Sequence, residues 1–121
     1  MRIERDAFYS MLGIAMRAGQ LTLGTDGVLG SIASGSAKIV LLDALASENT
    51  KKKFRDSCAY YGVELYETAP DRLGFAIGKP GRMCAAIAKG PLGDKLQMLA
   101  QQGRAGHMEG QQQYFTDMKR E

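Results

Sequence analysis

The chain has 121 residues, of which 45% are hydrophobic and 24% are charged, and its formal net charge is +3. This length suits a single domain, and no apolar run approaches the roughly 20 residues that a membrane span needs. The composition therefore argues against a membrane partner, while the mild positive charge permits a nucleic-acid partner without requiring one. The first residues, MRIERDAFYS, lack the apolar segment of a secretory signal, which favours a cytoplasmic protein.

The hydrophobic pattern alternates between helical and strand periods along the chain. Ser47 is expected to cap the start of the third helix, and Gly62 to end it. The expected helices are residues 6–19, 28–35, 48–62, 70–78 and a last one that begins at 91. The expected strands are residues 21–23, 38–42, 63–67 and 83–88. This order predicts a three-layer α/β/α sandwich around a single mixed sheet of about four strands.

The hydrophobic pattern fails near the end of the chain. From residue 101 onward the sequence is polar and rich in Gly and Gln, and three glycines interrupt any helical period. Such composition cannot bury enough apolar surface to offset the entropy of ordering. We therefore expect one folded domain over residues 1–100 and a disordered tail over residues 101–121.

Residues with catalytic or metal-binding chemistry are few and scattered. His107 is the only histidine and lies in the expected tail. Cys58 and Cys84 form no CxxC pair and are interpreted as buried packing residues. Asp43 and Glu48 lie near a helix start, where acids complement the helix dipole for structural reasons. The sequence therefore predicts no catalytic residue, no cofactor and no metal.

The stretch GTDGVLG at residues 24–30 has a glycine at every third position before a helix. Such a turn lets a phosphate approach the backbone amides of the helix start. It lacks both the Lys-Ser/Thr pair of a P-loop and the GxGxxG spacing of a dinucleotide site, which disfavours a nucleotide ligand. Two interpretations stay open: a turn that docks a nucleic-acid backbone, and a tight strand-to-helix turn with Thr25 or Asp26 as its N-cap.

Several motifs within residues 10–97 occur in a specific order, namely RAG, ASENTKKK, YYGV and LGFAIGK. In this order the chain resembles the small bacterial YlxQ-type proteins of the kink-turn-binding ribosomal protein superfamily, which includes the large-subunit proteins seven-Ae and thirty-e. The resemblance implies a thirty-e-like fold, no enzymatic activity, and RNA binding by three neighbouring segments. The implied RNA-binding residues are Gly24, Thr25, Asp26, Gly27 and Val28; Ser47, Glu48, Asn49 and Lys51; and Ile77, Gly78, Lys79, Pro80, Gly81 and Arg82.

The glycine stretch departs from the superfamily members that recognise kink-turns, which resemble one another in a Gly-x-Asn-Glu-x-x-Lys pattern. Asp26, Gly27 and Gly30 stand here at the places of the Asn, Glu and Lys. An Asp carboxylate cannot donate as an Asn amide does, and the two glycines supply neither an acceptor side chain nor a cation. The features left for RNA are therefore backbone amides, Thr25 and the basic residues of the other segments.

The basic residues form two candidate groups. Lys51 and Arg55 lie one helical turn apart, and Lys79 and Arg82 flank a Pro-Gly pair that favours a tight turn. Ile77 is a further candidate, for packing on an unstacked base. We expect a monomer whose partner is structured RNA such as ribosomal RNA, with no DNA; the alternative is a protein-interaction adapter on the same fold. The substrate-binding half of an RNA-modifying enzyme would need a catalytic domain, which this sequence does not show.

Overall fold

The computed structural model describes residues 2–103. Its elements are, in chain order, β1 Arg2–Ile3, α1 Asp6–Arg17, β2 Leu21–Leu23, α2 Thr25–Ser34, β3 Ala37–Asp43, α3 Glu48–Tyr61, β4 Glu64–Thr68, α4 Arg72–Ala76, β5 Cys84–Ala88 and α5 Pro91–Gly103. α5 thus reaches past residue 100, where the sequence pattern ends. The rest of the predicted tail, with His107, lies outside the described residues.

The strands form one mixed sheet in the order β1-β4-β3-β5-β2. β4 pairs in parallel with β1 and β3, whereas β5 pairs antiparallel with β3 and β2. The sheet has five strands, so the prediction of about four was too low. The missed strand, β1, consists of Arg2 and Ile3 alone, and two residues are too few to show an alternating pattern.

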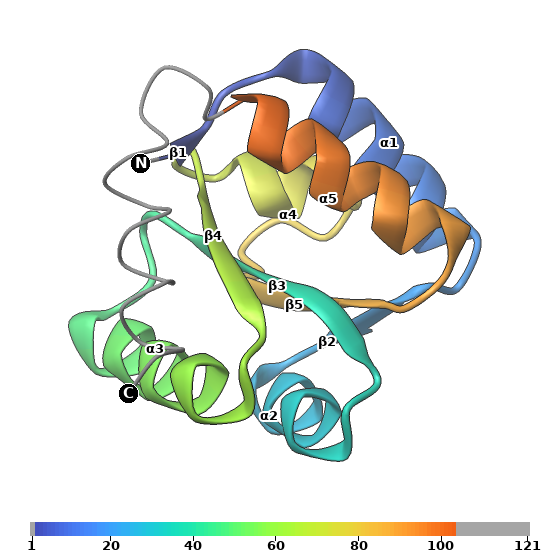
Figure 1. Ribbon diagram of the computed structural model, residues 1–121. Helices are drawn as coiled ribbons and strands as arrows, with labels where there is room; N and C mark the ends of the chain where they lie inside the picture. The colour runs from blue at the N-terminus through green and yellow to red at the C-terminus, as the bar shows by residue number, and fades with distance from the viewer. Residues whose placement is uncertain (1, 104–121) are drawn as a thin grey trace.

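Helices cover both faces of the sheet (Figure 1). α1, α4 and α5 pack on one face, and α2 and α3 pack on the other. β3 serves both layers, because Ile39 and Leu41 join the first core while Val40 and Leu42 join the second. This alternation is what a central strand covered on both faces requires. The predicted α/β/α sandwich is confirmed.

The helix ends follow the sequence in part. Ser47 caps α3 as predicted, since its Oγ accepts the Thr50 amide at 3.1 Å, and Gly62 ends that helix with a φ of 74°. The start of α2 differs. Its N-cap is Gly24, with a φ of 86°, and no side chain caps the helix. The interpretation with Thr25 or Asp26 as N-cap is wrong, because both residues already belong to the first helical turn.

Cys58 and Cys84 are free and buried in the core beneath α2 and α3, which confirms their interpretation as packing residues. Burial raises the pKa of the Cys58 thiol to about 12. Within residues 2–103 no group of three His, Cys, Asp or Glu side chains is placed to hold a metal ion. None of the helices in this part of the chain is long and apolar enough to cross a membrane.

Candidate functional site

The strands bring the three candidate segments to one edge of the sheet. The register pairs Leu42 with Cys84 and Asp43 with Thr68, and the Asp43 amide donates to the Met83 carbonyl at 2.8 Å. β2 ends at the same level, where Leu23 pairs with Ala85. The chain therefore leaves β2, β3 and β4 and enters β5 at a single edge. We call residues 24–28, 46–51 and 77–82, which follow or precede these strand ends, the loop edge.

The first segment of the loop edge is the start of α2. Val28 makes the first helical hydrogen bond, with its amide 2.9 Å from the Gly24 carbonyl. The amides of Thr25, Asp26 and Gly27 have no partner inside the helix, and they carry the positive end of the helix dipole. The Val28 side chain, by contrast, is fully buried in the core. This segment therefore offers its backbone N–H groups to an anion. The Val28 side chain is not available to a ligand.

Cys84 joins this helix start to the third segment. Burial raises the pKa of its thiol, while the Thr25 hydroxyl, the Gly24 backbone and the charge of Arg82 each lower it. Gly24, Thr25 and Arg82 thus lie close enough to the Cys84 sulfur to act on its pKa. The glycine turn and the end of the 77–82 loop are neighbours.

The third segment is a tightly defined loop after α4. Gly78, with a φ of 73°, lets the Lys79 amide reach back to the Gly74 carbonyl at 2.9 Å, which closes the helix in a Schellman motif. The next residues form a β-turn in which the Arg82 amide donates to the Lys79 carbonyl at 3.2 Å. Gly81 occupies the third position with a φ of 90°, as a type II turn requires. Lys79 and Arg82 therefore stand at the two ends of one rigid turn.

Both cations of this turn are available to a ligand. The side chains of Lys79 and Arg82 are exposed, and within residues 2–103 neither forms an ion pair. Ile77, in contrast, is 6% exposed and packs in the core with α1 and α5. The Ile77 side chain is therefore not accessible for the predicted packing on an RNA base.

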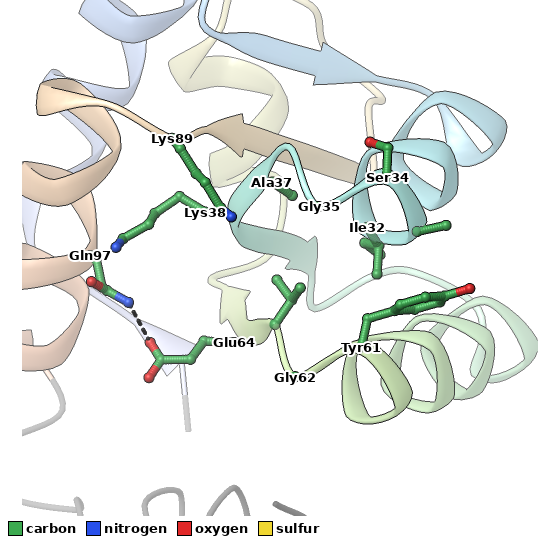
Figure 2. Close-up of a pocket in the computed structure, with 12 residues that line it drawn as sticks. Ile32, Ser34, Gly35, Ala37, Lys38, Tyr61, Gly62, Glu64, Lys89 and Gln97 are labelled. Carbon is green, nitrogen blue, oxygen red and sulfur yellow. Dashed lines mark hydrogen bonds between the residues drawn. The ribbon is translucent and has the colours of Figure 1, made fainter.

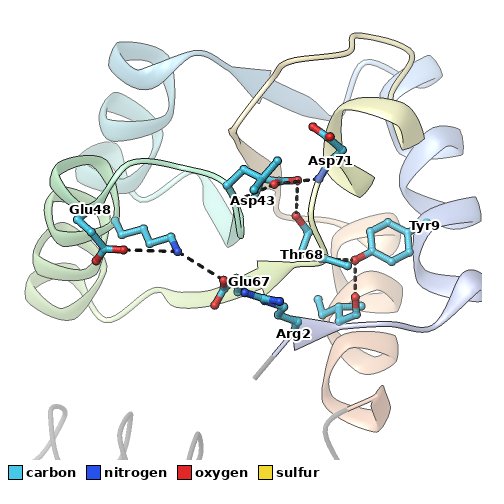
Figure 3. A network of polar contacts seen from close by, with 11 residues as sticks. Arg2, Tyr9, Asp43, Glu48, Glu67, Thr68 and Asp71 are labelled. Carbon is cyan, nitrogen blue, oxygen red and sulfur yellow. Dashed lines mark hydrogen bonds and ion pairs between the residues drawn. The ribbon is translucent and has the colours of Figure 1, made fainter.

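The second segment contributes fewer free groups than the sequence suggested. The Lys51 ammonium lies 3.7 Å from a Glu67 oxygen and 3.9 Å from a Glu48 oxygen, and its side chain is only 16% exposed (Figure 3). The Ser47 hydroxyl is engaged in capping α3. Asn49 is exposed, and within residues 2–103 its side-chain amide has no hydrogen-bond partner. Lys51 and Arg55 do not act as one pair of free cations, because the Lys51 charge is balanced by two carboxylates.

The buried Asp43 carboxylate connects the segments beneath the loop edge by hydrogen bonds. The sequence pattern did not predict this role for Asp43. Asp43 Oδ1 accepts from the amides of Leu45 at 3.0 Å and Asp71 at 3.1 Å, and Oδ2 accepts from the Thr68 hydroxyl at 3.2 Å and the Leu73 amide at 3.4 Å (Figure 3). These donors satisfy a fully buried group. Asp43 thus ties the turn after β3 to the start of α4, and Lys79 lies in the turn that follows this helix.

Two further features of the edge were missed by sequence reasoning. A Cβ atom on Gly74 would lie 2.9 Å from the Lys79 carbonyl oxygen and 3.0 Å from the Gly81 nitrogen, so the turn rests directly on this glycine. The only signal in the sequence was a glycine inside a helical pattern. Leu45, in the turn after β3, exposes 56% of its surface. In the sequence, Leu45 was marked only as an apolar residue between a strand and a helix cap.

Comparison with known proteins shows which family the chain belongs to. The ribosomal protein L7Ae/L30e/S12e/Gadd45 family matches residues 6–97. The chain belongs to this family. It is 40% identical over 91 residues to the "RNA-binding protein YlxQ" of Bacillus subtilis (strain 168), covering 74% of this chain and 90% of that protein. It is 37% identical over 88 residues to the protein of the same name from Enterococcus faecium, covering 72% and 85%.

A solved structure extends the likeness to distant relatives. The Giardia lamblia 15.5kD RNA binding protein superposes with a TM-score of 0.69 at 18% identity, over 85% of this chain and 92% of that one. At this identity the likeness concerns the fold alone. The resemblance of the sequence motifs to YlxQ-type proteins is confirmed by the two bacterial relatives, and the α/β/α fold by the Giardia protein.

Proposed function

We propose that this protein binds structured RNA through the loop edge, without catalysis, and that it acts on the ribosome or in translation. The observation that carries the proposal is the uncapped start of α2 beside a rigid turn with two exposed cations, Lys79 and Arg82. Backbone amides at a helix start and unpaired basic side chains are both groups that hold phosphates. The names of the two bacterial relatives, which describe RNA-binding proteins, support the same partner.

The contacts available at the loop edge favour the RNA backbone over the bases. The first turn of α2 presents the amides of Thr25, Asp26 and Gly27 to a phosphate. Lys79 and Arg82 add two cations that a phosphate pair can bridge. Phosphate contacts fix position and orientation but carry little sequence information. We therefore propose that the protein recognises the shape of a folded RNA, with Asn49 as a candidate for hydrogen bonding to a base edge.

An adapter for another protein is the second candidate, and one observation favours it. Leu45 and Phe75 are 56% and 69% exposed at and near the loop edge. Exposed apolar side chains of this size are common at protein interfaces. The two candidates differ in what holds the partner: cations and amides in one case, apolar side chains in the other.

Alanine substitution at the rigid turn separates the two functions. Replacing Lys79 and Arg82 together should weaken binding to a panel of folded RNAs by about tenfold or more, by similar factors for each RNA, because phosphate contacts are lost. Thermal stability should change little, since both side chains are exposed. Fluorescence titration and thermal unfolding measure the two effects.

A matched control removes two charges at the opposite edge of the sheet. Arg17, at the end of α1, and Lys95, in the second turn of α5, are both exposed. Their joint replacement by Ala should leave RNA binding close to that of the unmodified protein. Equal loss in the two double variants, or undiminished binding after Lys79→Ala and Arg82→Ala, would contradict RNA docking at the loop edge.

A further inference from the structure

A cleft of about 350 Å³ lies at the edge of the sheet opposite the loop edge (Figure 2). The ends of α2 and α3, the starts of β3 and β4, and the end of β5 form its walls. Tyr61 lines one side, and Lys38 and Lys89 extend from neighbouring strand ends on the other. The proposed function makes no use of these residues.

The two lysines of the cleft differ in their partners. The register between β3 and β5 shifts between Ala37 and Ile39, so Lys38 is the extra residue of a β-bulge, and its ammonium lies 3.3 Å from Asp94. Lys89 is exposed and forms no ion pair with any residue in the range 2–103. The nearby acid, Glu64, has its Oε1 atom engaged by the Tyr66 hydroxyl at 2.6 Å and the Gln97 amide at 3.1 Å. Lys89 is therefore a cation free to meet an anionic ligand.

Two tyrosines at the end of α3 expose their rings, and Tyr61 lies across the cleft from Lys89 (Figure 2). Tyr60 is 82% exposed and Tyr61 48% exposed, and their ring centroids lie 4.8 Å apart at an interplanar angle of 79°. The edge of one ring thus packs on the face of the other, which fixes both orientations. Exposed aromatic faces next to cations are the means by which proteins bind single-stranded nucleic acid, since every base can stack on such a face.

A stripe of residues along α3, exposed except at the half-buried Ser57, links this aromatic pair to the loop edge. Asn49, Lys53, Ser57 and Tyr60 follow one another at helical spacing along α3, on a different face from the buried Phe54. Lys53 is exposed and has no ion pair within the described part of the chain, whereas Lys52 pairs with Asp56 at 2.8 Å. Asn49 stands at the loop edge and Tyr60 beside the cleft. We call these four residues the α3 stripe.

We propose that a single-stranded RNA segment, continuous with RNA held at the loop edge, runs along the α3 stripe and stacks on Tyr60 and Tyr61. Lys53 and Lys89 contact its phosphates. The 14 residues of α3 span about 21 Å, so a strand of about six nucleotides covers this length even at the 3.4 Å spacing of fully stacked bases. The inference rests on the proposed function for the RNA at the loop edge, but the stacking surface has its own residues and its own test.

Two RNAs separate the two surfaces. One is a hairpin with blunt ends that the protein binds, and the other is the same hairpin with a single-stranded extension of about six nucleotides at either end. For the unmodified protein the extension at one of the two ends should raise affinity about tenfold, as expected for stacking of one or two bases. Tyr60→Ala combined with Lys89→Gln should abolish this gain and leave the affinity for the blunt hairpin unchanged.

Matched variants identify the contacts. Tyr60→Phe keeps the aromatic face and should keep the gain, whereas Tyr60→Ala alone should lose most of it. Lys53→Gln should reduce the gain, while Lys52→Gln, with the same loss of charge on another face of α3, should not. Tyr60 is almost fully exposed, so these variants are expected to fold, which circular dichroism verifies.

The outcomes are distinct for the two proposals. The affinity for the blunt hairpin tests the loop edge, and the difference between the two RNAs tests the α3 stripe. If no blunt hairpin binds, the free extension strand is titrated directly; Tyr60-dependent binding supports the stripe and its absence overturns it. A gain that survives Tyr60→Ala with Lys89→Gln would also overturn it. Binding of an oligo-glutamate peptide as tightly as the free strand would overturn it in favour of an acidic protein partner.

Discussion

Single residues decide whether the loop edge keeps its shape, and Gly74 is the clearest case. This helical glycine lies against the backbone of the turn that carries Lys79 and Arg82. A methyl group there would stand 2.9 Å from the Lys79 carbonyl oxygen and 3.1 Å from Pro80 Cα, and neither backbone atom can rotate away as a flexible side chain could. The absence of a side chain at Gly74 therefore sets the position of two cations that lie several residues further along the chain.

Gly74→Ala should consequently weaken RNA binding without removing any charge. Accommodation of the methyl group requires a backbone shift, which costs about 1–3 kcal/mol of stability and displaces the turn. The melting temperature should fall by several degrees, and the affinity for folded RNA should fall with it even at temperatures where the protein is fully folded. RNA titration and thermal unfolding of the same sample check both effects. Unchanged affinity in a destabilised but folded variant would show that the turn does not contact RNA.

The helix α2 contains two glycines, which have low helix propensity. Gly30 lies in its interior, where glycine costs roughly 0.5–1 kcal/mol relative to alanine, and Gly27 lies in its first turn. Their surroundings differ. A Cβ atom on Gly30 would have no atom within 4 Å, whereas one on Gly27 would lie 2.9 Å from Thr22 Cγ2. One glycine is open to substitution, and the other faces the end of a neighbouring side chain.

Gly30→Ala should therefore raise the free energy of unfolding by about 0.5–1 kcal/mol, because it restricts the unfolded chain and meets no clash. Gly27→Ala should raise it by less, since the Thr22 methyl group must move. Urea denaturation of the two single variants measures the difference. A larger gain at Gly27 than at Gly30 would contradict this account of α2. RNA binding by the Gly30 variant serves as a check that added helix stability leaves the loop edge intact.

The elements that the sequence predicted correctly are those whose signal is local. β3 shows buried residues on both faces, and α3 has both a Ser47 cap and a terminal glycine, so each could be located from its own residues. β1 could not, because its two residues become a strand only by pairing with Glu67 and Thr68 of β4. A strand that depends on its partner leaves little trace in its own composition.

The candidate site was likewise predicted only in part from the sequence. The three segments were found through the resemblance to a family, and the strand register explains why they meet. What the sequence could not provide is the direction of side chains: Lys51 turns toward Glu67 of β4, and Ile77 turns into the core. Both outcomes depend on contacts between residues far apart in the chain. The four donors of Asp43 belong to the same class, since three of them come from residues 68–73.

At the scale of the whole molecule, a net charge of +3 is too small to explain tight binding to a polyanion. The placement of charge is more informative. Several basic residues are balanced by carboxylates, as in the pairs Lys51–Glu67, Lys52–Asp56 and Arg72–Asp6. Lys79 and Arg82 are exposed without an ion pair in the described part of the chain. The number of counterions released on binding should therefore be small and traceable to identified residues.

The dependence of RNA affinity on salt tests this distribution directly. Each phosphate neutralised by a lysine or arginine adds about 0.7–0.9 to the slope of log affinity against log salt concentration, so replacing Lys79 and Arg82 by Ala should reduce the slope by about 1.4–1.8. Gly74→Ala, which displaces the same cations without deleting them, should lower the affinity and change the slope less. The Arg17→Ala, Lys95→Ala control should leave the slope unchanged. An affinity that does not vary with salt in the unmodified protein would exclude phosphate contacts at the loop edge and favour a protein partner held by Leu45 and Phe75.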